Sequence, residues 1–308
     1  MLTRTVYSLY YPETRAIVDR LWSGHHHEWY ERAYEKHQDV MHVEFLETWR
    51  AWCGLDLGDA FPHAYPTSGA SEPIKDLLLP PGALHVFAGD YEGYGILGKE
   101  RGMQVFTHER SVLAAREAFG EHDQFWVSFP SAIDGCIWPD LDAFLDEMRA
   151  RAPTVRVYLD VTYVGATTTK VRVDPRRHAN VAAVVFSLSK PMGVYYHRIG
   201  GCLSRTPMGT LWSNLWFKNL FSLQLGTALM KEHGVTALPA KYAPIQARVL
   251  AQLIASGRVP DSARASDVVL LAHAPNGLAG SEEYMRAPGH HRFCLTEGMD
   301  KTIKGRDE

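Results

Sequence analysis

The chain has 308 residues, of which 46% are hydrophobic and 22% charged, and its formal net charge is −3. This composition is typical of a globular protein with a sizeable core, and the small negative charge gives no electrostatic basis for binding nucleic acid or an anionic membrane. No apolar run approaches the roughly 20 residues of a membrane-spanning helix, and the first residues lack the pattern of a signal peptide.

The predicted elements begin with helices. Apolar spacing indicates helices over 12–22 and 28–52, and the stretch 64–78 reads as a turn that opens a helix. From residue 83 onward, short apolar runs alternate with helical patterns. The predicted strands cover 83–88, 103–107, 124–128, 155–159, 181–186 and 199–203, and the predicted helices cover 92–101, 111–119 and 139–151. This alternation predicts an α/β fold with a mainly parallel sheet covered by helices on both faces.

The pattern changes after about residue 205. Helices are predicted over 207–232 and 238–257, followed by short strands over 267–272 and 292–295. We therefore expect two structural units. They are a large α/β domain over 53–225, and a reduced α+β small domain that 226–308 form together with the N-terminal segment 1–52.

The segment 184–201, VVFSLSKPMGVYYHRIGG, places Lys190 directly after a buried strand. Ser187 and Ser189 precede this lysine, and Arg198 follows it by eight residues. A lysine amine becomes a useful nucleophile where its surroundings lower its pKa, and its main role with a cofactor is a Schiff base with an aldehyde such as pyridoxal phosphate. We therefore interpret Lys190 as a catalytic amine beside a bound phosphate, and not as a solvated lysine at a strand end.

A phosphate needs a cradle of hydrogen-bond donors. The segment TSGASE offers one at the start of a predicted helix, where backbone amides are free, although it also fits a plain helix cap. Arg198 would add a bidentate clamp, and Ser187 or Ser189 a hydroxyl. The residues of the predicted cradle are Ser68, Gly69, Ala70 and Ser71.

The pyridine ring of the same cofactor needs three further partners. Asp160 ends the predicted strand VRVYLD, at the edge where open α/β sheets bind ligands, and it could face the ring nitrogen. Tyr163 could donate a hydrogen bond to the phenolic oxygen. Tyr91, in GDYEGYG, is the candidate for stacking on the ring, with Tyr94 as the alternative.

These motifs follow one another in the order TSGASE, GDYEGY, SFPSAIDG, LDVTY and SLSK-x-x-G-x-x-x-x-R-x-G. Over roughly 60–300, the chain resembles the fold type I aminotransferase superfamily of pyridoxal-phosphate enzymes. The resemblance implies a Schiff base on Lys190, phosphate binding by Arg198, and the cofactor roles given above for Asp160 and Tyr163. It also implies that Arg292, in HHRFCLTEG, binds the α-carboxylate of an amino acid substrate.

The resemblance further implies a pyridoxal-phosphate-dependent aminotransferase that forms a homodimer with a shared active site. The chain departs from the family's pattern at two positions. Ala132 stands where the family's Asn-Pro-Thr-Gly has the asparagine that bonds the phenolic oxygen, and Pro191 directly follows the lysine. Together with the short chain, these departures leave other amino-acid reactions open: elimination, replacement, decarboxylation, aldol chemistry or cyclisation. A non-catalytic binding module with the same fold is a third alternative.

Metal binding and disulfides are not expected. The histidines at 25–27 are consecutive and lack a partner at ligand spacing, so we expect a solvated or substrate-facing loop. His290 and His291 lie beside Arg292 in sequence and could line a substrate pocket. The four cysteines are far apart and lack CxxC spacing, which indicates reduced thiols and a cytoplasmic protein.

Overall fold

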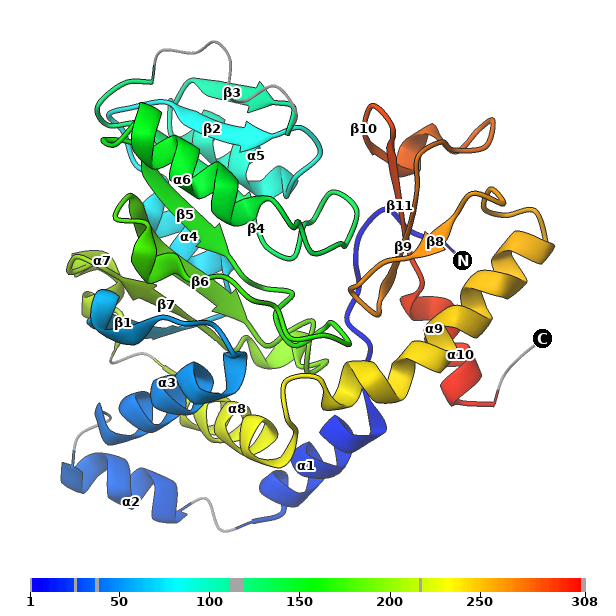
Figure 1. Ribbon diagram of the computed structural model, residues 1–308. Coiled ribbons are helices and arrows are strands. Elements are labelled where there is room, and N and C mark those ends of the chain that lie inside the picture. The colour runs from blue at the N-terminus through cyan, green and yellow to red at the C-terminus, as the bar shows by residue number, and fades with distance from the viewer. Residues whose placement is uncertain (1, 25–26, 37–38, 111–118, 216–217, 306–308) are drawn as a thin grey trace.

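The computed structural model describes residues 2–24, 27–36, 39–110, 119–215 and 218–305. Figure 1 shows a large sheet with its covering helices and, beside it, a small sheet packed against α9 and α10. The predicted helix over 111–119 lies almost entirely outside the described residues. Among the described residues, no helix combines the length and the apolarity that crossing a membrane requires.

The large sheet has seven strands. Their order across the sheet is β1 (His63–Thr67), β7 (Gly200–Ser204), β6 (Val181–Ser187), β5 (Arg156–Asp160), β4 (Gln124–Ser128), β2 (Leu84–Phe87) and β3 (Val105–His108). The pairs from β6 through β5, β4 and β2 to β3 are parallel, and β7 runs antiparallel to both of its neighbours. This confirms the predicted α/β class with a mainly parallel sheet.

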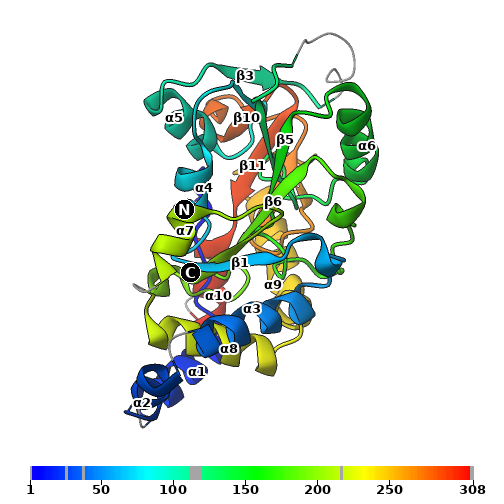
Figure 2. The ribbon, with the colours of Figure 1, turned by 90° about the vertical axis from the view of Figure 1, so that its left-hand side faces the viewer.

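Helices cover both faces of this sheet. One face carries α4 (Ser71–Leu77), α5 (Glu92–Glu100) and α7 (Gly209–Ser213), and the other carries α3 (Asp39–Cys53), α6 (Leu141–Arg151) and α8 (Leu220–Glu232). Figure 2 shows α4, α5 and α7 on one side of the sheet and α6 on the other. All five residues of β4 are buried, with Phe125 and Val127 in one hydrophobic cluster and Trp126 in the other. A strand buried on both faces is what a parallel sheet between two helical layers requires.

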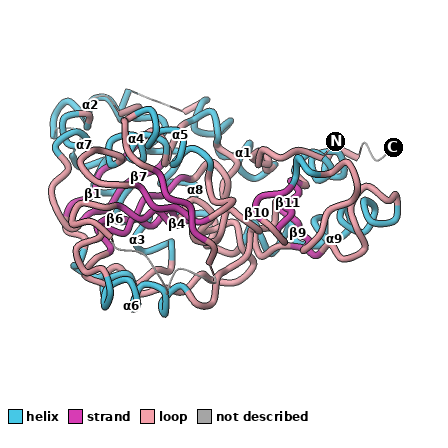
Figure 3. The backbone as a smooth tube through the Cα atoms, turned by 90° about the horizontal axis from the view of Figure 1, so that it is seen from above, coloured by secondary structure: helices cyan, strands magenta, loops and turns pink. Residues whose placement is uncertain are grey.

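The small sheet has four antiparallel strands. Their order is β10 (Met285–Ala287), β11 (His290–Cys294), β9 (Leu271–Ala274) and β8 (Arg264–Ala265), and the accompanying helices are α9 (Ala237–Ala255) and α10 (Thr296–Ile303). Figure 3 shows this sheet beside the helix-covered large sheet. The N-terminal segment runs past β11 and then along the gap between the sheets to α1 (Pro12–Trp22), and Thr3 pairs with Cys294. The first residues of the chain thus lie against its last strand.

Several predicted boundaries are wrong. The single helix predicted over 28–52 is two helices, α2 (His27–Lys36) and α3, and the one predicted over 207–232 is divided into α7 and α8. The stretch read as a turn at 64–67 is strand β1, whose apolar character is hidden by His63 and Pro66. The strand predicted over 267–272 starts at Leu271, after a turn. The division of the chain at residues 53 and 225 stays a prediction, although α3 packs on the large sheet through a stacked Trp49–Phe186 pair with ring centroids 3.8 Å apart.

Candidate active site

A cavity of about 1030 Å³ lies where β4, β5 and β6 end. The last residue of each of these strands lines it: Ser128, Asp160 and Ser187. The carboxyl ends of parallel strands are the usual ligand site of such sheets. The predicted site residues that line this cavity are Ala70, Ser71, Tyr91, Asp160, Tyr163, Ser187, Ser189, Lys190, Arg198 and Arg292. The structure therefore brings the predicted lysine, carboxylate and arginines together.

Lys190 points its amine into this cavity. Its Nζ donates a hydrogen bond to the backbone oxygen of Val6 and lies 5.7 Å from the centroid of the Tyr195 ring. Burial lowers the pKa of this amine to about 8, and the positive charges of Arg292 and Arg198 act in the same direction. A neutral amine is consequently accessible close to physiological pH, which a nucleophilic lysine requires.

Asp160 lies buried at the end of β5, held by neutral donors. Its Oδ1 accepts hydrogen bonds from the backbone N–H of Thr162 at 3.0 Å and from the Thr162 hydroxyl at 2.5 Å. Its Oδ2 accepts from the Tyr94 hydroxyl at 2.7 Å. Burial raises the pKa of this carboxyl, the hydrogen bonds oppose that rise, and the nearby charge of Asp90 adds to it. A carboxylate in such surroundings would be stabilised by a cationic ring N–H.

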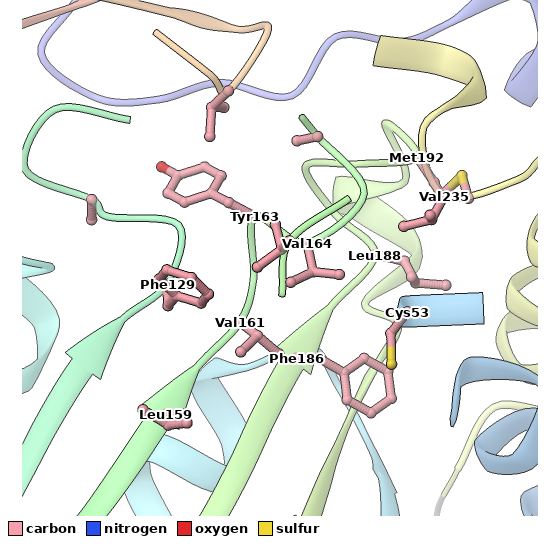
Figure 4. Close-up of a cluster of buried hydrophobic side chains, with 14 of the residues drawn as sticks. Cys53, Phe129, Leu159, Val161, Tyr163, Val164, Phe186, Leu188, Met192 and Val235 are labelled. Atoms are coloured by element: carbon pink, nitrogen blue, oxygen red, sulfur yellow. The ribbon is translucent and has the colours of Figure 1, made fainter. Parts of the chain in front are cut away.

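Tyr163 follows β5 and presents its hydroxyl to the cavity. Figure 4 shows its ring above Val161 and Val164, with the hydroxyl directed away from them. Burial raises the pKa of Tyr163 to about 12, so the phenol stays protonated and able to donate a hydrogen bond at neutral pH. Tyr91 lies at the rim, 47% exposed, and its ring meets the Tyr94 ring edge-on at a centroid distance of 5.2 Å.

Arg198 reaches back to the segment before α4. Its Nη2 donates to the backbone oxygen of Ser68 at 3.0 Å and to the hydroxyl of Ser71 at 2.7 Å. Arg198 itself has a φ of 50°, in the left-handed region. Gly69, with a φ of 77°, lets the guanidinium approach, because an added Cβ would lie 2.8 Å from Nη2. Ser68 and Gly69 thus shape the site through Arg198 and do not form its wall.

The hydroxyl of Ser187 lies near this guanidinium, because an added Cβ at Gly69 would lie 3.5 Å from Ser187 Oγ as well as 2.8 Å from Nη2 of Arg198. Ser189 is its neighbour. The two serine hydroxyls are hydrogen-bonded to each other at 2.9 Å, and both line the cavity. Helix α4 has only seven residues, so its dipole is a weak attraction for a phosphate. The guanidinium of Arg198 and the hydroxyls of Ser71, Ser187 and Ser189 are better suited to hold one.

Arg292 lies on β11, buried at the far wall of the cavity. Its Nη1 donates to the backbone oxygen of Ala132, and its Nη2 donates to that of Arg4 at 3.0 Å. Its Nε is buried and has no hydrogen-bond partner within the described part of the chain. Nη1 and Nη2 each carry a second N–H, and these donors could bind a carboxylate that enters the cavity.

Several cavity residues were not foreseen from the sequence. The largest group is the N-terminal segment, of which Arg4, Val6 and Ser8 line the cavity. The Ser8 hydroxyl donates to the backbone oxygen of Ser189 at 2.6 Å. No local signal could reveal these contacts, because the partners lie about 180 residues apart in sequence. Arg286 and Glu92 were missed for the same reason.

The histidines singled out earlier lie elsewhere. His290 and His291 are absent from the cavity wall, His27 is exposed at the start of α2, and 25–26 fall outside the described residues. Within the ranges that the structure covers, no group of three histidine, cysteine or acidic side chains could hold a metal ion.

Comparison with known proteins places this geometry in a known fold. No family model matches the chain, and no curated protein matches its sequence. Among solved structures, the histidinol-phosphate aminotransferase from Clostridium acetobutylicum has a TM-score of 0.72 at 11% identity, covering 98% of this chain and 96% of its own. The histidinol-phosphate aminotransferase from Sinorhizobium meliloti, solved with pyridoxal-5'-phosphate, has a TM-score of 0.68 at 14% identity, with 99% and 91% covered.

A third similar structure is the L-threonine-O-3-phosphate decarboxylase from Porphyromonas gingivalis, with a TM-score of 0.58 at 14% identity, covering 87% of this chain and 95% of its own. At these identities the likeness shows the fold alone. The mostly parallel central sheet with its covering helices agrees with it. This chain therefore has the fold of the fold type I pyridoxal-phosphate-dependent aminotransferases.

Proposed function

We propose that the protein is a pyridoxal-phosphate-dependent aminotransferase that acts on an α-amino acid. The observation that carries the proposal is the convergence of four side chains on one cavity: Asp160 from the end of β5, Lys190 and Arg198 from the connection between β6 and β7, and Arg292 from β11. No single one of these residues is diagnostic. Their arrangement provides an amine of lowered pKa, a buried carboxylate and two separate cationic positions for two anionic groups.

The residues present fit the cofactor. Arg198, Ser71 and the hydroxyls of Ser187 and Ser189 would hold its phosphate. In the described part of the chain, the donors that bond Asp160 are all neutral. A protonated ring nitrogen would therefore give the Asp160 carboxylate a cationic partner. When bound, pyridoxal phosphate supplies an electron sink for the negative charge that develops at the substrate's Cα.

The chain's own residues then have distinct tasks. Lys190 provides the amine that links the cofactor, and the same amine can take up and return a proton at the substrate's Cα. Asp160 keeps a proton on the ring nitrogen, and Tyr163 donates a hydrogen bond to the phenolic oxygen. Arg292 binds the substrate's carboxylate and so fixes which bond at Cα stands perpendicular to the ring.

A different amino-acid reaction on the same scaffold is the second candidate. The observation in its favour is Ala132, which lines the cavity and stands where the family's pattern has the asparagine that bonds the phenolic oxygen. Without that donor, only Tyr163 of the predicted pair remains to tune the ring. Elimination, replacement, decarboxylation, aldol chemistry and cyclisation all remain accessible to such a site.

We also propose a cytoplasmic homodimer. The cavity mouth carries exposed aromatic rings, with Tyr7 57%, Tyr195 47% and Tyr196 91% exposed. A second copy of the chain would cover these rings. All four cysteines are free thiols, in keeping with a reducing compartment. Light scattering should give twice the mass of the chain, and Tyr196→Arg should shift the protein toward the monomer. A monomeric wild type would refute the dimer.

The decisive experiment is to add pyridoxal phosphate to the purified protein and record its absorption before and after a panel of amino acids. Borohydride reduction followed by peptide mapping should place the cofactor on Lys190. Conversion of the cofactor to its amine form, with release of a keto acid, would establish transamination. Release of ammonia or carbon dioxide with an unchanged cofactor would support the second candidate. A protein that takes up no cofactor would exclude both.

A further inference from the structure

Three charged side chains form a cluster on the cavity wall outside the predicted site. Arg286 of β10 and Arg4 of the N-terminal segment both donate hydrogen bonds to the same oxygen, Oε1 of Glu92 at the start of α5. The Arg286 bond is 2.8 Å long. All three side chains line the main cavity. The proposed function assigns none of them a role.

Arg286 is the fixed member of this cluster. Its side chain is only 5% exposed, its Nε donates to the backbone oxygen of Gly89 at 3.2 Å, and its Nη2 donates to that of Asp90 at 2.9 Å. Arg4 and Glu92 have side chains that are 50% and 51% exposed, so they can change partners. The cluster thus combines one buried guanidinium held in place with two adjustable groups.

The charges of this cluster do not cancel. Two guanidiniums share one carboxylate, which leaves one positive charge on the wall. Burial and the neighbouring charges of Arg292 and Arg4 lower the pKa of Arg286, an indication that the three guanidiniums lie close together. In the proposed function, Arg198 is neutralised by the phosphate and Arg292 by the substrate's carboxylate. The positive charge beside Arg286 remains without a counterion.

We propose that Arg4 and Arg286 form a subsite for a second anionic group, a carboxylate or a phosphate, on the side chain of the amino acid substrate. The proposal rests on the proposed function, because Arg292 is taken to hold the first carboxylate. Glu92 occupies the subsite when no substrate is bound, and the substrate's distal anion replaces it on Arg4. A cationic side chain is the less suitable occupant, since Glu92 is already shared by two guanidiniums.

A second, smaller cavity of about 220 Å³ supports this assignment. Arg4, Tyr91, Glu92 and Arg286 line both cavities, so the cluster forms the wall between them. The smaller cavity also carries Lys99. When a distal anion displaces its carboxylate, Glu92 can turn toward this second space, where a cation is available.

The test uses ligands that need no turnover. Glutarate and its monoamide, glutaramate, both offer one carboxylate to Arg292 and differ only in the distal group. Two further probes change that distal group: 4-phosphonobutanoate carries a phosphonate, and 5-aminopentanoate carries a cation. Their binding to the full chain is measured by calorimetry, with and without pyridoxal phosphate. We expect glutarate or the phosphonate to bind at least about tenfold more tightly than glutaramate, and whichever is tighter identifies the distal anion.

Variants with opposite expected effects separate the proposal from a purely structural role of the cluster. Arg4→Gln should remove the preference for the dianion and leave glutaramate binding unchanged. Glu92→Gln should enlarge the preference, because the competing carboxylate is gone. Arg15→Gln, which removes an arginine of an exposed pair on α1, is the matched control and should change neither.

Equal binding of glutarate and glutaramate to the wild type would overturn the inference, as would a preference for 5-aminopentanoate or failure of every probe to bind. An equal effect of Arg4→Gln on both probes would also overturn it. Cofactor uptake is read separately from its visible absorption. If the protein prefers the dianion but takes up no pyridoxal phosphate, the subsite is supported and the proposed aminotransferase function is refuted.

Discussion

The hydroxyl of Tyr94 donates a 2.7 Å hydrogen bond to Oδ2 of Asp160, and both side chains are buried. This bond lowers the pKa of the carboxyl, against the burial that raises it. Burial itself raises the pKa of Tyr94 well above its ordinary value, so the phenol keeps the proton that it donates to Asp160. Tyr94 therefore favours the ionised form of the residue that would hold a proton on the ring nitrogen.

Replacing Tyr94 with phenylalanine should slow the reaction of the loaded enzyme with amino acids about 10- to 100-fold near pH 7, since a hydrogen bond to a buried carboxylate contributes roughly 1.5–3 kcal/mol. The loss should shrink as the pH rises, because more Asp160 then ionises without help. Single-turnover absorption measurements across pH would show this. Tyr91→Phe removes a hydroxyl from the exposed neighbour and is the control. A loss that is the same at every pH would contradict the assignment.

The amine of Lys190 should react with pyridoxal phosphate in its neutral form. Because burial lowers its pKa to about 8, the rate of cofactor uptake should rise about tenfold per pH unit below 8 and level off above it. A free lysine derivative would continue to gain rate up to roughly pH 10.4. Stopped-flow absorption between pH 6 and 11 tests this. An uptake rate that keeps rising beyond pH 10 would show that the amine has an ordinary pKa.

Gly69 and Gly102 form a matched pair for the phosphate site. Their φ angles are 77° and 75°, so alanine at either position adds a similar backbone strain of about 1 kcal/mol. An added Cβ at Gly102 meets nothing within 4 Å, whereas at Gly69 it lies 2.8 Å from Nη2 of Arg198. Both variants should lose similar stability, but only Gly69→Ala should weaken binding of pyridoxal phosphate and of inorganic phosphate, by about tenfold or more. Equal affinities in the two variants would mean that Arg198 does not hold the phosphate.

Much of the large sheet could be predicted because its signals are local. The run QFWVS of β4 has three consecutive apolar residues at its centre, and a short apolar run flanked by helical patterns indicates a strand buried on both faces. The eight-residue spacing from Lys190 to Arg198 is likewise contained in one loop and its flanking strands. Strand β1 was missed because HAYPT contains a proline and a histidine, and only its pairing with β7 makes it a strand.

The parts of the site that the sequence did not indicate are contacts over long distances along the chain. Val6 meets Lys190, and Arg286 meets Glu92, across 184 and 194 residues. Such contacts depend on how the small sheet and the N-terminal segment dock against the large sheet, which no periodicity encodes. Tyr94 was noted only as an alternative stacking residue, because its burial and its contact with Asp160 follow from the packing of α5.

The N-terminal segment is held against the loop after β6 by a close approach at Gly193. This glycine has a φ of 70°, and an added Cβ would lie 2.1 Å from the backbone oxygen of Leu9. Gly193→Ala should therefore push the segment away from the cavity and weaken the contacts of Val6 with Lys190 and of Ser8 with Ser189. Gly280→Ala is the control, because Gly280 has a φ of 80° and its added Cβ would meet nothing within 4 Å.

Backbone strain should lower the free energy of unfolding of both variants by about 1 kcal/mol. Urea unfolding should show a distinctly larger loss for Gly193→Ala. Limited proteolysis should cut the first eleven residues faster in Gly193→Ala alone. The inflection of cofactor uptake should also move above pH 8 in that variant, since a lysine that is less buried regains a higher pKa. If the two variants were equally stable and equally resistant to protease, the segment would not depend on Gly193 for its position over the lysine.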